Sequence, residues 1–145
     1  MPRDEDFGTE LASRLTAKYV GLIHEVEWTY DAYLELDQLA PDRPYCKVSP
    51  GNYTVWREGR HDWREQIALQ LTLVSAVGAT DDEYWIGQWL GSWDQLIRET
   101  REDPLFDRHK PMSIDQDERY DTNLFHNHRR LLTQATLHYH NVEIL

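Results

Sequence analysis

Histidine is the one residue type dense enough in this sequence to suggest a metal site. Of its seven histidines, four form two closely spaced pairs, His126 with His128 and His138 with His140. Residues two apart in a strand point to the same face of a sheet, so two such pairs on neighbouring strands could surround a Zn²⁺ ion. Their spacing does not follow the patterns of known zinc sites, and a solvated polar face opposite Leu137 and Tyr139 is the simpler explanation. We therefore predict no metal and no other cofactor, and keep these four histidines as the candidate ligands.

Other catalytic patterns are missing from the sequence. It has no Gly-x-Ser-x-Gly elbow and no phosphate-binding loop, and its one cysteine, Cys46, is expected to be a small buried hydrophobic residue. Carboxylates cluster at residues 4–6, 81–83 and 115–118, where a chain terminus, a helix start and a loop explain them without catalysis. The sequence therefore predicts that the protein is not an enzyme.

The length and the net charge of the chain limit which classes of protein it can belong to. The chain has 145 residues, which suits a single domain spanning 1–145, and 15 basic against 26 acidic residues give it a formal net charge of −11. Such acidity argues against a nucleic-acid binder, because Lys and Arg supply the affinity for phosphates. No apolar run is long enough to span a membrane, and none at the start has the form of a secretory signal.

The first half of the chain predicts one helix followed by strands. Apolar residues such as Leu11 and Leu15 recur at helical spacing from residue 9 to about residue 25, whereas residues 26–40 fit either a strand or a helix. A Pro-Gly turn at 49–52 between short strands at 45–48 and 53–56 predicts a hairpin. After a polar turn at 57–60, large apolar residues at every second position from Ile67 to Leu73 predict a long strand over 63–77 with one face buried.

The second half predicts a helix, a loop and a last strand. A capping box at Thr80–Glu83 starts a helix that reaches about Glu102, and Gly87 and Gly91 are expected to let this helix pack closely against the sheet. Residues 103–123 are predicted to be a long acidic loop with one short helical turn starting at Ser113, and residues 131–140 alternate like a strand. The expected fold is α+β, an antiparallel sheet of about four strands covered by two amphipathic helices.

Six tryptophans are more than a domain of this size usually needs in its core. Trp85, Trp89 and Trp93 recur every four residues and so form one face of the second helix. Because Trp and Tyr are enriched at the centres of protein interfaces, some of the aromatic residues are expected to contact another subunit. The interface candidates are Trp28, Trp56, Trp63, Trp85 and Tyr139.

This order of elements resembles the tail-terminator and tail-completion proteins of tailed bacteriophages. The resemblance extends over residues 9–140 and is carried by the strands Trp63–Leu71 and Leu131–Tyr139, with Pro104-Leu105-Phe106 between them. It implies a non-enzymatic virion subunit, assembled in the host cytoplasm, that forms a ring of typically six copies at the head–tail junction. Such a ring ends the tail tube and docks the head connector, while genome DNA passes through its lumen without specific binding. The long loop at 103–123 and the Trp-rich second helix depart from this pattern.

Three alternatives stay open at the level of sequence. A neck or head-completion protein, acting as a stopper or adaptor, would have a similar size and a related structural role. An acidic protein-binding module would use the negative charge directly, although acidic and basic residues are interleaved along most of the chain. A small His-ligated metalloprotein would use the four paired histidines described above.

Overall fold

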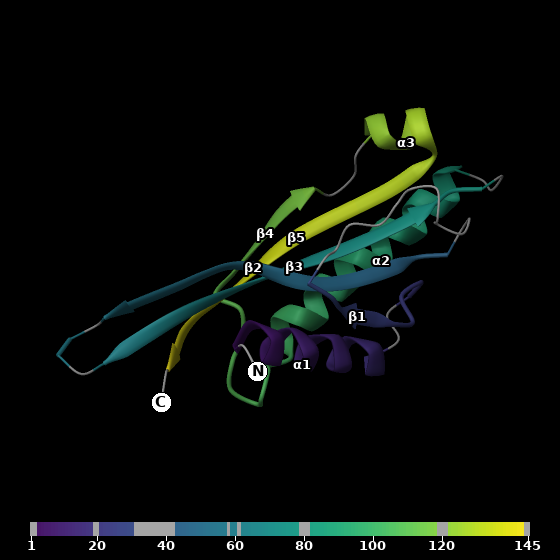
Figure 1. The fold of residues 1–145 in the computed structure, drawn as a ribbon. Coiled ribbons are helices and arrows are strands. Elements are labelled where there is room, and N and C mark those ends of the chain that lie inside the picture. Colours follow the sequence, from purple (N-terminus) through teal and green to yellow (C-terminus); the bar gives the residue numbers. More distant parts are fainter. Residues whose placement is uncertain are drawn as a thin grey trace.

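One five-stranded sheet, with helices packed against one of its faces, forms the framework of the protein (Figure 1). The computed structural model describes residues 3–18, 21–30, 43–57, 59–60, 62–78, 82–118 and 122–143. The strand order is β1-β2-β3-β5-β4; β1 and β2 are parallel, and every other neighbouring pair is antiparallel. The elements are α1 (Arg3–Lys18), β1 (Val26–Trp28), β2 (Tyr45–Arg57), β3 (Trp63–Ala76), α2 (Asp82–Glu102), β4 (Ser113–Glu118), α3 (Thr122–His128) and β5 (Arg130–Glu143).

The core lies between the two long central strands and the helices α1 and α2. Alternate residues of β3 and β5 point into it, and Leu71 on β3 and Leu137 on β5 are completely buried. From α2, Trp89 and Trp93 fill the space beneath the sheet, and the indole N–H of Trp89 donates a 2.6 Å hydrogen bond to the hydroxyl of Thr133 on β5. The predicted α+β class, the long strand at 63–77 and the helix ending at Glu102 are confirmed.

The sheet is larger and more mixed than the sequence indicates. The Pro-Gly turn predicted at 49–52 is wrong, because β2 runs straight through it and pairs with β3 on both sides of a bulge between Pro50 and Tyr53. Pro50 is tolerated there because, on the side away from β3, β2 borders only the short strand β1, whose pairing with it ends at Val48. The true hairpin turn is the one predicted at 57–60, where Gly59 has a φ of +96°.

The predicted long loop at 103–123 contains ordered structure. Residues Ser113–Glu118 form β4, which pairs with β5, so the helical turn expected at Ser113 is a strand instead. The segment that follows includes the start of a third helix, α3. Acidic residues and two prolines obscured the alternation of this short edge strand, and only pairing with the neighbouring strand makes it stable.

The N-terminal helix begins earlier than its leucine pattern suggests. It starts at Arg3, because Asp4, Glu5 and Asp6 suit the positive end of a helix dipole and Phe7 is buried one turn before Leu11. The segment left open at 26–40 begins as a strand at Val26–Trp28, and residues 31–42 lie outside the described residues.

Candidate interaction surface

The β2–β3 hairpin has two parts with different surroundings. Its root, residues 45–50 and 67–76, lies within the sheet and over the helices. Its arm, Gly51–Arg57 and Trp63–Gln66 with the turn between them, projects beyond the helices (Figure 1). Tyr53 pairs with Ile67 at the base of the arm, and Arg57 pairs with Trp63 next to the turn. The arm is therefore a paired β-hairpin rather than a loop, and Arg64 and Glu65 of its β3 strand also pair with Glu143 and Val142 of β5.

The apolar face of the root continues onto the arm, where its large apolar side chains are partly exposed to solvent. In the root this face includes Val48 and Leu69, which are completely buried. On the arm the same face presents Tyr53, Val55 and Trp63, whose exposed fractions are 47%, 42% and 49%. Because side chains alternate across a strand, these three large apolar residues lie on one side of the ribbon. Exposed apolar groupings of this kind mark interaction sites on soluble proteins.

A buried carboxylate fixes the base of the arm. Glu65 on β3 is fully buried, and Arg3 at the start of α1 donates a 2.8 Å hydrogen bond from its Nε to Glu65 Oε1. The Tyr53 hydroxyl donates to the other oxygen, Oε2. This hydrogen bond to a carboxylate raises the pKa of Tyr53 to about 12. The clamp ties both strands of the arm to α1, so the arm holds a defined direction relative to the body.

The five predicted interface residues lie in different surroundings. Trp63 is half-exposed on the apolar side of the arm, and Trp56 is partly buried on the opposite side. Trp85 is partly buried against the core at the first turns of α2. Trp28 is also partly buried and lies so close to Gly8 of α1 that any side chain there would collide with its ring.

Tyr139 is the one candidate that the fold places inside the protein. Its side chain is only 1% exposed and packs edge-on against Phe7, with ring centroids 5.7 Å apart. Burial raises the pKa of its hydroxyl above the usual range. The expectation that Tyr139 contacts another subunit is therefore corrected: on β5 it shares the inward face with Leu137, and it belongs to the core.

The four candidate metal ligands are not brought together. His126 and His128 lie on α3 rather than on a strand, next to the start of β5, whereas His138 lies eight residues along β5, a separation of about 25 Å. His138 instead lies between Asp115 on β4, 2.9 Å from its Nε2, and Gln66 on β3, 3.1 Å from its Nδ1. In the described part of the chain, no group of three or more His, Cys, Asp or Glu residues is arranged to hold a metal ion.

Cys46 is buried, as predicted, and offers no accessible nucleophile. Its side chain packs from β2 into the core, and burial raises the pKa of its thiol to about 12. At neutral pH this thiol is protonated and shielded from solvent, which is the state of an inert structural cysteine.

Strands β2 and β4 contain charged residues of opposite sign. Strand β2 contains Lys47 and Arg57 and no acidic residue, whereas β4 contains Asp115, Asp117 and Glu118 and no basic residue. The ammonium of Lys47 is paired with Glu27 of β1 at 2.5 Å, while the guanidinium of Arg57 donates to the Gly59 carbonyl in the turn. Within the β2 strand of the arm, the basic residue Arg57 therefore lies next to the turn.

Sequence reasoning missed Tyr53, Val55 and Glu65 as members of this surface. It assigned residues 53–56 to a strand of a different hairpin, so their pairing with Glu65 and Ile67 was not foreseen. The signal that could have found them is the turn at 57–60: a hairpin closed there places residues 53–57 opposite 63–67.

Neither a family model nor any curated protein matches this sequence. None of the described helices has the length and the apolar character needed to cross a membrane.

Proposed function

We propose that the protein is a structural, non-enzymatic subunit of a tailed bacteriophage, which assembles into a ring at the head–tail junction, ends the tail tube and docks the head connector. The observation that supports this proposal most strongly is the arm, a rigid ribbon that exposes Tyr53, Val55 and Trp63 beyond the body of the subunit. The phage assignment itself rests on the resemblance of the strands Trp63–Leu71 and Leu131–Tyr139 to those of tail-terminator and tail-completion proteins.

The shape of the subunit favours association over catalysis. A projecting apolar ribbon costs solubility in a monomer, and it gains a role when another surface covers it. The arm is clamped by Arg3 and Glu65, so little conformational freedom is lost when a partner binds it. A subunit of this kind suits a ring, where each copy holds the next.

The strong acidity suits a ring through which DNA must pass. With a net charge of −11 per subunit, six copies would carry about six times that charge, and like charges repel the phosphate backbone. Such a lumen lets DNA slide without binding. The position along the neck, as terminator or as stopper or adaptor, depends on which neighbours bind the two faces of the ring.

Native mass spectrometry across a concentration series, with negative-stain microscopy of the same samples, tests this proposal. We expect closed rings with a central hole, with six copies as the expected number. An arm variant in which Tyr53 and Trp63 are both replaced by Ser should remain folded and lose the rings, since both residues are about half exposed in the subunit. A wild-type protein that stays monomeric at every concentration would contradict the proposal.

A further inference from the structure

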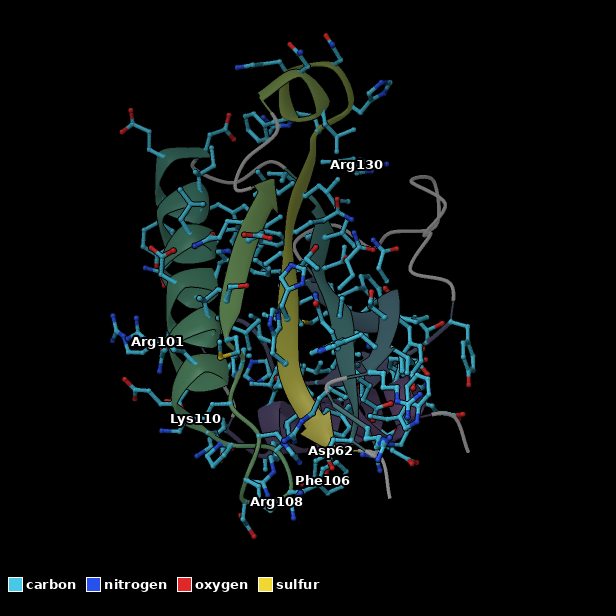
Figure 2. The ribbon with its side chains drawn as sticks, turned by 90° about the vertical axis from the view of Figure 1, so that its left-hand side faces the viewer. Asp62, Arg101, Phe106, Arg108, Lys110 and Arg130 are labelled. Carbon is cyan, nitrogen blue, oxygen red and sulfur yellow. The ribbon has the colours of Figure 1, made fainter. Side chains whose placement is uncertain are left out.

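A tight turn at Leu105–His109 closes over the start of α1. Figure 2 shows its residues Phe106 and Arg108 at the end of the molecule opposite Arg130. The backbones of Leu105 and His109 exchange two hydrogen bonds, of 2.8 and 2.9 Å, and so form a short antiparallel bridge. The side chain of Leu105 is completely buried and anchors the turn to the body. The turn is therefore a defined element with one end fixed in the core.

The backbone of this turn is unfavourable for the residues that occupy it. Phe106 has a φ of 52° and Asp107 has a φ of 61°, values that residues with a side chain rarely adopt. Two consecutive residues with positive φ form the tightest hairpin turns, where Asn and Gly are the usual residues. Contacts made by the rest of the turn must offset this strain, so the turn opens when those contacts weaken.

Two rings of the turn cover Phe7 of α1. The ring centroid of His109 lies 5.2 Å from that of Phe7, and the ring centroid of Phe106 lies 5.3 Å from it. Phe7 also packs against Tyr139 of β5 and is only 2% exposed. The turn therefore acts as a cap that separates a core residue from solvent.

The charges around His109 favour its neutral ring. Its Nε2 lies 3.5 Å from a terminal guanidinium nitrogen of Arg108, and Arg3 at the start of α1 is a second cation that acts on the ring. Burial, followed by these two cations, holds the pKa of His109 below its ordinary value of 6.5. A proton on this ring would add a third positive charge to the same corner of the molecule.

The other ionisable groups of this corner are already engaged or uncharged. Asp103, directly after α2, and Asp107 in the turn accept hydrogen bonds of 2.9 and 3.2 Å from Arg14 of α1. Burial raises the pKa of Tyr139 on β5 above the usual range, so its hydroxyl is neutral near neutral pH. Within the described part of the chain, no carboxylate contributes to the shift in the pKa of His109.

We propose that the Leu105–His109 turn is an acid-sensitive cap over Phe7, which is closed near neutral pH and opens when His109 is protonated. Protonation places a further cation beside Arg108 and Arg3 and leaves the ring without an acceptor nitrogen. Opening relieves the unfavourable backbone of the turn and exposes Phe7 to solvent. This device goes beyond the proposed function, since it needs only one copy of the chain.

Acid favours the open turn. A histidine whose pKa is lower in the closed state binds fewer protons there than in the open state, so the closed state loses stability as the pH falls. The contribution of His109 to closure is complete above about pH 6.5 and declines below it. The cap therefore responds in the mildly acidic range.

An NMR titration of the full chain between about pH 7.5 and about pH 5 tests the cap. The ring of His109 should titrate below 6.5, and the ring signals of Phe7 and Phe106 should shift with the same midpoint. The amides of Arg108 and His109, which donate to the Leu105 carbonyl, report opening through hydrogen exchange. After correction for the intrinsic effect of pH, their exchange should speed up by about fivefold or more over this range.

A variant without the titrating group separates the cap from general acid unfolding. His109→Phe keeps an aromatic ring against Phe7 and cannot gain a proton, so its turn should stay closed over the whole range. His128→Gln is the matched control, because it removes an exposed histidine of α3 and should leave the acid response of the turn unchanged. Circular dichroism checks that both variants fold, and the titration of the wild type stands without them.

Each outcome decides for or against the cap. A common midpoint for His109, Phe7 and Phe106 that disappears in His109→Phe supports it. A His109 that titrates at or above 6.5 overturns it, as does a turn whose amide exchange does not respond to acid. Acid opening of the turn in His109→Phe to the same extent as in the wild type would also overturn it. None of these results bears on the proposed assembly, so the two proposals fail separately.

Discussion

The root and the arm of the β2–β3 hairpin are made of the same two strands, yet one is core and the other is surface. In the root, Val48 and Leu69 are completely buried, whereas in the arm Tyr53 and Trp63 are about half exposed. Both parts place apolar residues on the same face, and they differ in what lies beneath it. The helices of the subunit cover the root, whereas most of the arm projects beyond them and is contacted by Arg3 at the start of α1 through Glu65. In the function proposed above, another copy of the subunit covers the apolar side of the arm that the helices leave exposed.

The largest expected effect is on stability and concerns a tryptophan of the core. Trp89→Ala should lower the free energy of unfolding by about 3–5 kcal/mol, because it removes a fully buried aromatic ring and leaves a cavity. The hydroxyl of Thr133 also loses its indole partner. Chemical denaturation measures this change. A loss below about 1 kcal/mol would mean that α2 is not packed beneath the sheet as described.

A matched tryptophan on the arm should behave in the opposite way. Trp63→Ala should change the free energy of unfolding by less than about 1 kcal/mol, since half of the side chain already meets solvent. It should weaken self-association by about 2 kcal/mol or more, the effect of losing an aromatic anchor from an interface. Denaturation and analytical ultracentrifugation of the same sample separate the two effects. Equal losses of stability for Trp63→Ala and Trp89→Ala would remove the distinction between arm and root.

This pair of tryptophans also shows how far sequence reasoning reached. Alternation in 63–77 and the four-residue spacing of Trp85, Trp89 and Trp93 were enough to predict the long strand, the second helix and the side of each that packs into the main core, although both faces of the strand are buried over residues 71–76. Local pattern could not predict where the helices stop covering the sheet, because that depends on pairing between distant segments. The same reason hid β4, whose acidic residues alternate too briefly to signal a strand before β5 is placed beside it.

The clamp at the base of the arm offers a smaller and sharper test. Glu65→Gln should cost about 1–2 kcal/mol of unfolding free energy, because it keeps an oxygen that can accept from Arg3 but removes the negative charge that pairs with the guanidinium. The cost stays modest since the exposed part of Arg3 can be solvated. Tyr53→Phe is the matched control, which removes the other hydrogen bond to Glu65 and leaves the carboxylate in place. No loss in either variant would mean that the clamp does not hold the arm.

The same clamp makes the arm sensitive to alkaline pH. The pKa of Tyr53 is raised to about 12 from 10.0, first by its hydrogen bond to Glu65. A pKa that is higher in the folded state means that the contribution to stability is complete below about pH 10 and is lost as the pH rises through about 12. NMR titration of the tyrosine ring carbons should show this delayed ionisation, and Glu65→Gln should return it toward 10. A Tyr53 that titrates normally in the wild type would contradict the contact.

The smallest expected effect concerns the outer side of α2. Gly87 and Gly91 were expected to allow close packing against the sheet, but a methyl group added at either position would meet no atom within 4 Å. Gly87→Ala and Gly91→Ala should therefore each stabilise the isolated subunit by about 0.5–1 kcal/mol, since Ala is the better helix former. Each substitution is made in the arm variant in which Tyr53 and Trp63 are replaced by Ser, so that thermal unfolding measures the stability of the subunit without assembly. A destabilisation would show that these positions are packed within the subunit.

Hydrogen–deuterium exchange at low and at high protein concentration tests the central claim most directly. The claim is that the arm is surface in the subunit and core in the assembly, while the root is core in both. We predict that the amides of residues 51–57 become strongly protected as concentration rises, and that those of the root, such as Leu69 and Leu71, exchange equally slowly at both concentrations. Assembly without any gain of protection in the arm would contradict the account.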